Sequence, residues 1–361
     1  MMQENDSILV FEYFTASGEK DKCIISEAEA LVFALLDDLA DFKIDLVINE
    51  SYENAVKDYE NVNPILIDVD VVDWLKDNAA EFSKAIFIAA ENDNNLYNIT
   101  RILEENDVKI YNSSSDACLI ASDKFETYEA LSNIVPQPRT FRFKIDPKGY
   151  WKRAIENLHE KWQAEDPLTP LKLIIKPLVG VDCEDIVIIE KIEDLTLDLD
   201  KIFKPGSRVI VQEFVDGTDI SISLISDGEK AIPLSLNEQF VSLKDDKGTY
   251  IGGKLPFESK YGDEAFEIAT KAVEAIGLKG FVGVDLIINA DEKDIYSVYL
   301  LEINSRFTTP YIGLKQVASI NIGKSIIGLI DGNMDINELD ISLDGEVEFK
   351  KSGDNMLIRR I

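Results

Sequence analysis

The chain has 361 residues, of which 45% are hydrophobic, and a formal net charge of −31 at pH 7. Because this length exceeds that of one compact core, we expect two or three packed subdomains. The negative charge excludes nucleic acids and anionic membranes as partners, since both surfaces repel an acidic molecule. The three cysteines lack paired spacing, which indicates a reduced, cytoplasmic environment. No signal peptide and no apolar run of ~20 residues is present, so we expect neither secretion nor membrane anchoring.

The first third of the chain alternates short apolar segments with helical patterns. Strands are predicted at residues 8–13, 44–48, 85–90 and 108–111. Leucines at helical spacing predict a helix over 26–42, and Ser26 with Glu29 matches a capping box at its start. This alternation predicts an open α/β sheet. No G-x-G-x-x-G follows the first strand, which argues against the usual dinucleotide site.

Polar residues follow two of these predicted strands. Ligands of open α/β sheets gather at the carboxyl ends of strands, so these residues are candidates for binding a substrate. The candidates are Glu12, Tyr13, Thr15, Ser17 and Glu91. Ordinary loop polarity is the alternative interpretation.

Oxygen-bearing side chains gather at the end of a later apolar segment. Alternation along a strand places Glu302 and Asn304 on one face. If Asp285 comes from a neighbouring strand, the three side chains form a cluster of hard oxygen donors with Arg306 close by. Such a cluster suits Mg²⁺ (or Mn²⁺) bound to nucleotide phosphates. A solvated strand edge is the alternative.

A lysine and a broken strand accompany this cluster. Lys176 lies at the end of the apolar run in segment 173–177, and Pro177 stops the predicted strand. A second predicted strand, 209–214, is interrupted and resumes at 220–224. At this point the chain resembles the ATP-grasp superfamily of carboxylate-amine ligases over about residues 110 to 325. The matching motifs, in the order of that family, are Asp123-Lys124, Ile175-Lys176-Pro177, Gln212-Glu213, Asp285 and Glu302-Ile303-Asn304-Ser305-Arg306.

The resemblance implies an ATP-grasp fold behind an N-terminal open α/β domain, with ATP as the nucleotide. It assigns phosphate binding to Lys124 and Lys176, and a phosphate-covering loop to the segment that contains Gly180. The resemblance also implies an adenine hinge formed by Gln212, Glu213 and Val215. It implies Asp219 as the ribose ligand.

The same resemblance gives the chemistry of the metal cluster. Asp285, Glu302 and Asn304 are the implied magnesium ligands, and Arg306 contacts phosphate or acyl phosphate. Lys176 and Arg306 are the implied catalytic residues. A carboxylate would attack the γ-phosphorus of ATP, and an amine would then displace phosphate from the acyl phosphate. Positioning, magnesium and cationic side chains supply most of the catalysis in such a reaction.

Two positions depart from the pattern of this family. The loop 181–185 is acidic where relatives often have several glycines, so its role over the phosphates is left open. Gly283 stands where the D-alanine:D-alanine ligases place an arginine, so their substrate is not transferred.

Four segments are predicted along the chain. They are an N-terminal α/β substrate-side domain at 1–115, a linker and small central ATP-grasp subdomain at 116–210, a C-terminal ATP-grasp subdomain with the metal site at 211–335, and a short extension at 336–361.

Sequence segments outside the ATP motifs indicate a particular group within this superfamily. Segments 11–18, 180–186, 236–239 and 252–253 are similar to the archaeal carboligase group that includes the tyramine:L-glutamate ligases of methanofuran biosynthesis. This similarity implies joining the γ-carboxylate of glutamate to tyramine. It also implies a substrate loop, with glycines that allow close backbone approach. The residues of that loop are Asn237, Gln239, Gly252 and Gly253.

Other functions stay open. A different ATP-grasp amino-acid or peptide ligase would use another amine, and a non-catalytic nucleotide-binding regulator would keep the fold without turnover. An intact Asp285, Glu302 and Asn304 trio favours turnover. The expected partners are small-molecule carboxylates and amines, and a homodimer is one alternative for the assembly.

Overall fold

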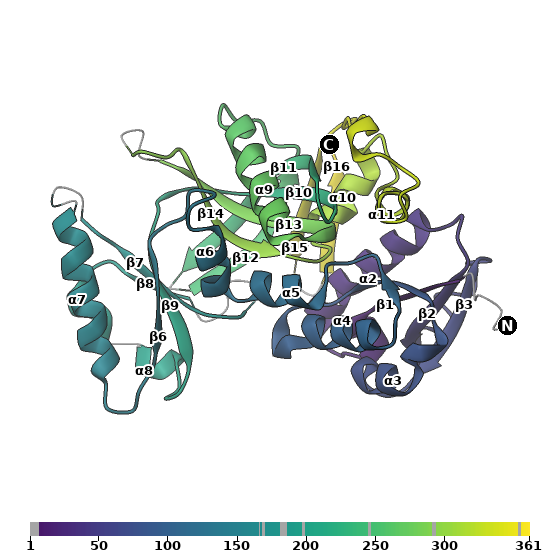
Figure 1. Ribbon diagram of the computed structural model, residues 1–361, viewed down its shortest axis with the longest axis horizontal. Coiled ribbons are helices and arrows are strands. Elements are labelled where there is room, and N and C mark those ends of the chain that lie inside the picture. Colours follow the sequence, from purple (N-terminus) through teal and green to yellow (C-terminus); the bar gives the residue numbers. More distant parts are fainter. Residues whose placement is uncertain are drawn as a thin grey trace.

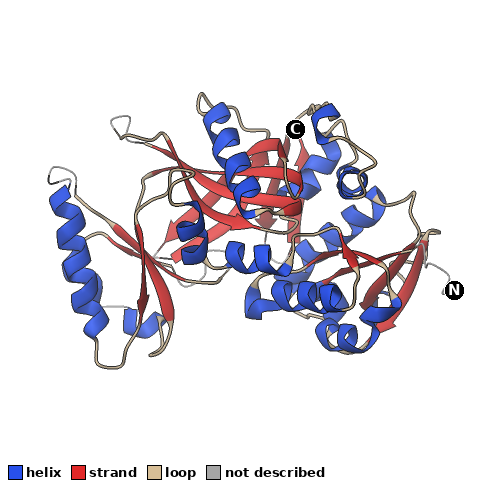
Figure 2. Cartoon of the chain, viewed as in Figure 1, coloured by secondary structure: helices blue, strands red, loops and turns tan. Residues whose placement is uncertain are grey.

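Three sheets built from successive parts of the chain form the molecule (Figure 1). The structure is a computed structural model that describes residues 7–165, 167, 170–180, 186–196, 199–244, 247–290, 294–352 and 355–361. Helices lie against the strands of each sheet (Figure 2). None of the helices in this described part combines the length and apolar character that a membrane span requires.

The N-terminal sheet is parallel, with the order β3-β2-β1-β4-β5. Its strands are β1 (Ile8–Glu12), β2 (Ile44–Asn49), β3 (Val62–Ile67), β4 (Lys84–Ile88) and β5 (Lys109–Ile110). Its helices are α1 (Tyr13–Ser17), α2 (Lys22–Asp38), α3 (Val71–Asn78) and α4 (Asn95–Glu105), with the 3-10 turns η1 (Glu50–Tyr52), η2 (Ala79–Glu81) and η3 (Asn92–Asn94). The predicted open α/β domain is confirmed.

Alternation along β1 explains why helices cover both faces of this sheet. Leu9 and Phe11 are buried in the cluster that contains α3 and α4, whereas Ile8 and Val10 are buried in the cluster that contains α2. The sequence prediction missed β3, an edge strand that contains Pro64, a residue that is uncommon within strands.

The predicted start of the long N-terminal helix is wrong by four residues. Helix α2 begins at Lys22, where the Asp21 carboxylate caps it by accepting from the Cys23 amide. Ser26 instead accepts a hydrogen bond from the Met356 amide near the C-terminus, at 2.8 Å. The Glu29 carboxylate accepts from the Tyr52 hydroxyl. A tertiary contact has therefore recruited the two side chains that matched a local capping pattern.

Helices α5 (Ser115–Ser122) and α6 (Lys124–Leu131) lead into a small antiparallel sheet with the order β6-β9-β7-β8. Its strands are β6 (Thr140–Lys144), β7 (Leu173–Pro177), β8 (Val187–Ile189) and β9 (Arg208–Glu213). Helix α7 (Tyr150–Glu165) forms the outer flank of this lobe (Figure 1), with η4 (Ile192–Thr196) and α8 (Leu199–Ile202) beside it. Trp151, Ile155 and Trp162 bury the inner face of α7.

The third sheet has seven antiparallel strands in the order β14-β13-β10-β11-β12-β15-β16. They are β10 (Gly217–Asp227), β11 (Ala231–Lys244), β12 (Lys247–Leu255), β13 (Lys279–Asn289), β14 (Val298–Asn304), β15 (Val347–Ser352) and β16 (Asn355–Arg360). Its helices are α9 (Gly262–Ile276), α10 (Pro310–Val317) and α11 (Ile322–Ile330), with η5 (Ile336–Glu338). Gly277 ends α9 at φ 73°, a conformation that glycine adopts readily.

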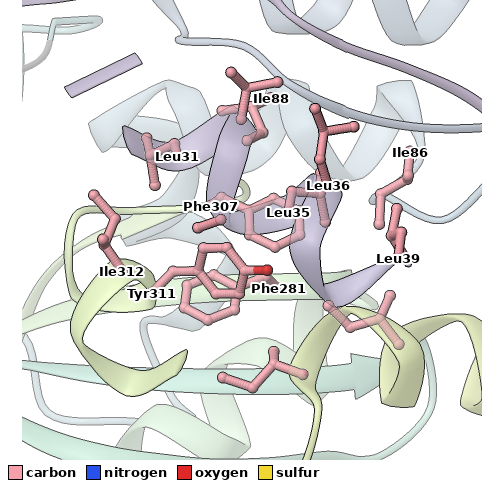
Figure 3. Close-up of a cluster of buried hydrophobic side chains, with 14 of the residues drawn as sticks. Leu31, Leu35, Leu36, Leu39, Ile86, Ile88, Phe281, Phe307, Tyr311 and Ile312 are labelled. Atoms are coloured by element: carbon pink, nitrogen blue, oxygen red, sulfur yellow. The ribbon is translucent and has the colours of Figure 1, made fainter. Parts of the chain in front are cut away.

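The two faces of this large sheet have different partners. On one face, alternate residues of β10 such as Ile220 and Ile222 pack with Ile268 of α9. On the other face, Phe281 and Phe349 join a core that also contains α2 and β4 of the N-terminal domain. Figure 3 shows this shared core, where Leu31, Leu35, Leu36 and Leu39 of α2 face Phe281, Phe307 and Tyr311. One continuous apolar core therefore joins the N-terminal domain to the large sheet.

The predicted substrate loop around residues 237 and 252 is wrong as to local structure, since both segments are strands of this sheet. Asn237 lies in β11, has no exposed surface and donates to Ser221 and Ser223. A Cβ atom on Gly252 of β12 would lie 2.1 Å from the carbonyl oxygen of Phe349. The glycines therefore permit close approach of strand β15, not of a substrate.

This packing predicts that Gly252→Ala destabilises the protein by about 2 kcal/mol or more, because it adds a clash with backbone to a φ of 145°. Gly206→Ala is the matched control, since Gly206 has φ 101° but no atom within 4 Å of the added carbon. Chemical unfolding of both variants measures the difference. Equal losses in the two variants would contradict the proposed role of the β12–β15 contact.

Candidate active site

A cavity of about 230 Å³ lies between the small sheet and the large sheet. We call it the inter-sheet cavity. Strands β7 and β9 form one wall, and strands β10, β11, β13 and β14 form the other. The polar residues of its lining are Lys124, Lys176, Gln212, Glu213, Asp216, Asp219, Gln239, Asp285 and Glu302, and Gly180 also lines it. Most candidates for nucleotide and metal binding therefore meet at one place.

Two carboxylates face each other on adjacent strands of the large sheet. Asp285 of β13 is the direct register partner of Glu302 of β14, so their side chains lie on the same face. The Asp285 oxygens accept from Gln239 at 2.8 Å and from Asn304 at 2.9 Å. The condition for the predicted cluster, that Asp285 comes from a neighbouring strand, is therefore met. Gln239, predicted for the substrate, contacts this pair instead.

The proximity of these carboxylates changes their acidity. Burial and the charge of Glu302 raise the pKa of Asp285 to about 7. Burial also acts to raise the pKa of Glu302, but the positive charges of Lys124 and Lys176 outweigh it and hold that pKa below its usual value. The pair therefore shares its negative charge unequally, and a cation placed between the two groups would stabilise both in the ionised form.

Two lysines approach these acids from separate elements. Lys124 is the first residue of α6, and its Nζ lies 3.1 Å from a Glu302 oxygen and donates to the Gly180 carbonyl at 3.1 Å. Lys176 of β7 is only 8% exposed. Its charge helps to lower the pKa of Glu302. Burial raises the pKa of Asp219, and the charge of Lys176 offsets part of that rise. The two lysines thus place positive charge beside the carboxylates that line the same cavity.

The predicted hinge begins in the last two residues of β9 and lines the inter-sheet cavity. The Gln212 side chain donates to Thr140 at 2.9 Å, and the Glu213 carboxylate accepts two hydrogen bonds of 2.8 Å from Arg139. Both side chains are therefore engaged within the protein, and the amides of Glu213 and Phe214 donate to the carbonyls of Arg139 and Lys172. Val215 and Asp219 line the same cavity. The sequence prediction did not include Arg139.

A second cavity, which we call the central cavity, continues from the carboxylate pair. Asn304 and Arg306 line it, and Gly283 forms part of its floor. The Arg306 guanidinium donates to Glu91 at 2.8 Å, and Glu91 is only 5% exposed. A Cβ atom on Gly283 would approach Thr308 within 2.9 Å, so a larger side chain does not fit without displacing Thr308. Glu91, predicted for the substrate, therefore orients Arg306.

A third cavity, the N-terminal cavity, lies beyond Arg306 against β1 and α2. Glu12 lines it, and burial raises the pKa of this carboxyl to about 7 although it accepts hydrogen bonds from Thr15 and Phe14. The other three candidates of this region are not among the residues that line these three cavities. Thr15 is buried, and Tyr13 and Ser17 donate to Asp70.

Two residues of the N-terminal cavity were not predicted. Glu27 lies on α2, four residues before Leu31, so it continues the apolar stripe of that helix. Lys351 lies on β15 and follows Val347 and Phe349 at alternate positions. Both residues could have been found from the sequence, because each is an ionisable residue that continues the apolar pattern of its helix or strand. The acidic loop 181–185 lies outside the described residues.

Comparison with known proteins places these features in a family. A model of the ATP-grasp domain matches residues 121–310. The tyramine–L-glutamate ligase of Methanocaldococcus fervens is 33% identical over 321 residues, which are 87% of this chain and 91% of that relative. The tyramine–L-glutamate ligase of Methanocaldococcus jannaschii is 32% identical over 94% of this chain and 92% of that relative.

Solved structures have the same fold. A crystal structure of an ATP-grasp superfamily protein from Archaeoglobus fulgidus superposes with a TM-score of 0.69 at 22% identity, covering 98% of this chain and 100% of that one. The chain therefore belongs to the ATP-grasp family, together with the archaeal tyramine–L-glutamate ligases to which it is similar along most of its length.

Proposed function

We propose that this chain is an ADP-forming ligase that joins the γ-carboxylate of L-glutamate to the amine of tyramine. The main observation in support is the pair formed by Asp285 and Glu302, which lines a cavity together with Lys124 and Lys176. The relatives at 32–33% identity, which are tyramine–L-glutamate ligases, support the choice of substrates. Asp219, Val215 and the backbone after Gln212 and Glu213 hold the nucleotide in this proposal.

The donor set at the carboxylate pair fits a magnesium ion. Among the described residues, no group of three or more His, Cys, Asp and Glu side chains could hold a metal by itself. Magnesium does not require such a group, because it binds through one or two carboxylates and completes its shell with phosphates and water. Asp285 and Glu302 supply the carboxylates, and Asn304 supplies an amide oxygen. Bound there, magnesium neutralises charge on the phosphates of ATP.

The protein side chains then position two successive displacements. An oxygen of the substrate carboxylate attacks the γ-phosphorus of ATP, the bond to the bridging oxygen breaks, and ADP leaves. The amine nitrogen next attacks the acyl carbon, phosphate departs, and the nitrogen loses a proton to give the amide. Lys124 and Lys176 hold the phosphates, and Arg306 faces the carboxylate between the central and N-terminal cavities.

Turnover is favoured over a purely regulatory role by the completeness of this arrangement. The carboxylate pair, both lysines and Arg306 are all present, and Glu91 holds Arg306 through an ion pair with little solvent exposure. A protein that only bound nucleotide would not need an oriented guanidinium beyond the metal ligands. The functional proposal therefore includes catalysis.

The direct test is product analysis with purified protein. ATP, magnesium, L-glutamate and tyramine should yield ADP, phosphate and γ-glutamyltyramine, identified by mass spectrometry and fragmentation. Omission of either substrate should abolish the amide product. Amide formation with another amine, and none with tyramine, would overturn the assignment of tyramine while keeping a ligase activity.

Glu302→Gln should lower kcat on the order of 10²-fold or more, because it removes one charge of the pair that faces the phosphates. The variant should keep its fold, since glutamine has the same shape. Glu267→Gln, on the exposed face of α9, is the control. Steady-state ADP release measures both. Normal turnover by Glu302→Gln would remove this residue from the proposed site.

Asp285→Asn should stabilise the protein free of metal and nucleotide, and more so at pH 8 than at pH 5.5. The pKa of Asp285 is about 7 in the folded state, above the value near 3.9 in an unfolded chain. The folded protein therefore loses stability as pH rises from about 4 to 7, and the loss is complete above 7. Asparagine removes this loss, so we expect a gain above about 1 kcal/mol at pH 8.

Chemical unfolding at the two pH values measures this effect. Asp340→Asn is the control, since Asp340 is exposed and distant in sequence from the pair. A difference between Asp285→Asn and the wild type that does not change with pH would show that the carboxyl group is not strained by its neighbours.

A further inference from the structure

The three cavities form a series of adjoining spaces. The inter-sheet and central cavities share Gln239, Asp285 and Glu302, and the central and N-terminal cavities share Glu27 and Arg306. A molecule held in the N-terminal cavity can therefore extend a carboxylate past Arg306 toward the carboxylate pair. In the proposed reaction, that carboxylate is the group that attacks ATP.

The N-terminal cavity combines both signs of charge with an apolar wall. Its volume is about 170 Å³, enough for a small amino acid. Ile24, Leu31 and Ile88 supply apolar surface suited to methylene groups. The ionisable groups that line it are Glu12, Glu27, Arg306 and Lys351, besides Cys23. Such a lining suits a ligand that is itself a zwitterion.

All four charged groups have structural partners, and Lys351 Nζ also lies 5.7 Å from the centre of the Tyr250 ring. The Glu12 oxygens accept from the amides of Phe14 and Thr15 at the start of α1. Arg306 is bound to Glu91 and points to the passage between cavities. Glu27 accepts from Thr309 with one oxygen, and its other oxygen lies 3.6 Å from Lys351 Nζ. An anion and a cation are therefore adjacent on the cavity wall.

Lys351 reaches this wall because the C-terminal hairpin pairs with the large sheet. Val347 and Phe349, at alternate positions of β15, are buried in the shared core, and Lys351 follows on the same face. Lys350 is exposed on the opposite face. The matched ATP-grasp domain ends at residue 310, so this lysine comes from outside it.

We propose that Glu27 and Lys351 bind the α-ammonium and α-carboxylate of the carboxylate substrate, and thereby direct its side-chain carboxylate to Arg306 and the central cavity. The identity of this substrate as L-glutamate rests on the proposed function. Ammonium and carboxylate on one carbon atom match an adjacent anion and cation, which Glu27 and Lys351 provide. Because the α-carboxylate is held by Lys351, the γ-carboxylate is the one that receives phosphate.

Tyramine fits this end of the cavity less well than an amino acid does. Tyramine has a single positive charge and no carboxylate. Its ammonium group could bind Glu27, but it has no group that could bind Lys351. An α-amino acid satisfies both groups together. The N-terminal cavity therefore selects the carboxylate substrate, and the charged pair determines which of its two carboxylates reacts.

Substrate analogues that each lack one group test the two contacts separately. Glutarate lacks the ammonium group of glutamate, and 4-aminobutanoate lacks its α-carboxylate. Lys351→Met should raise KM for L-glutamate by about tenfold or more, and change KM for 4-aminobutanoate by less than about twofold. Glu27→Gln should likewise raise the KM for L-glutamate and leave the KM for glutarate almost unchanged. The KM for ATP should stay constant in both variants.

Two further variants separate charge recognition from damage to the fold. Lys350→Met, on the other face of β15, should behave like the wild type. Lys351→Arg should restore most of the preference for L-glutamate over 4-aminobutanoate, because it restores the positive charge. If Lys351→Met keeps the wild-type preference between these two substrates, Lys351 does not bind the α-carboxylate and the inference is overturned.

A binding measurement distinguishes this inference from the proposed function. Calorimetric titration of L-glutamate is carried out in the presence of magnesium and a non-hydrolysable ATP analogue. Weaker binding to Lys351→Met and Glu27→Gln would support the amino-acid site even if no amide product formed with tyramine. Amide formation with unchanged glutamate affinity in both variants would support the ligase and overturn the amino-acid site.

Discussion

The close approach of Asp285 and Glu302 is the constraint on which the rest of the site depends. Two carboxylates side by side repel each other, so the pKa of Asp285 is raised, whereas the two nearby lysines keep the pKa of Glu302 low. Register between β13 and β14 forces them together, and Gln239 and Asn304 hold Asp285 in position. The free protein tolerates the pair because Lys124 lies 3.1 Å from Glu302. Such an arrangement is costly until a cation and phosphates arrive.

The overall charge of the chain makes local placement of cations decisive. A molecule with a net charge of −31 repels polyphosphate at a distance. Lys124 and Lys176 offset this repulsion only because two different elements, α6 and β7, bring them to the same cavity. Screening in salt weakens the long-range repulsion more than these short contacts. Acidity of the whole surface and affinity for a nucleotide are therefore compatible.

The apolar core shared by the N-terminal domain and the large sheet sets the geometry of the cavities. Leu31 and Leu35 of α2 pack with Phe281 and Tyr311, so α2 is held against the sheet that contains the carboxylate pair (Figure 3). Glu27 lies one turn earlier on the same helix and faces the cavity. Packing of this kind fixes positions more tightly than surface ion pairs do, because close-packed side chains leave little freedom.

The sequence by itself determined the local elements and the chemistry of the motifs. Apolar periodicity located most strands and helices, and the resemblance of the motifs around Lys124, Lys176, Asp285 and Glu302 to the ATP-grasp family implied the nucleotide site. These signals are local, since each depends on a few neighbouring residues and on the fixed alternation of side chains along strands. Alternation placed Glu302 and Asn304 on one face of a strand, and the pairing of that strand with the one that contains Asp285 completes the cluster.

Only the tertiary structure decided which residues meet across the domains. Ser26 matched a capping box, yet it binds the amide of Met356, and Gly252 makes room for strand β15. Lys351 and Glu27 are separated by more than 300 positions in sequence but lie 3.6 Å apart. Contacts of this range depend on how sheets and helices pack, and no pattern within a short segment of sequence contains that information.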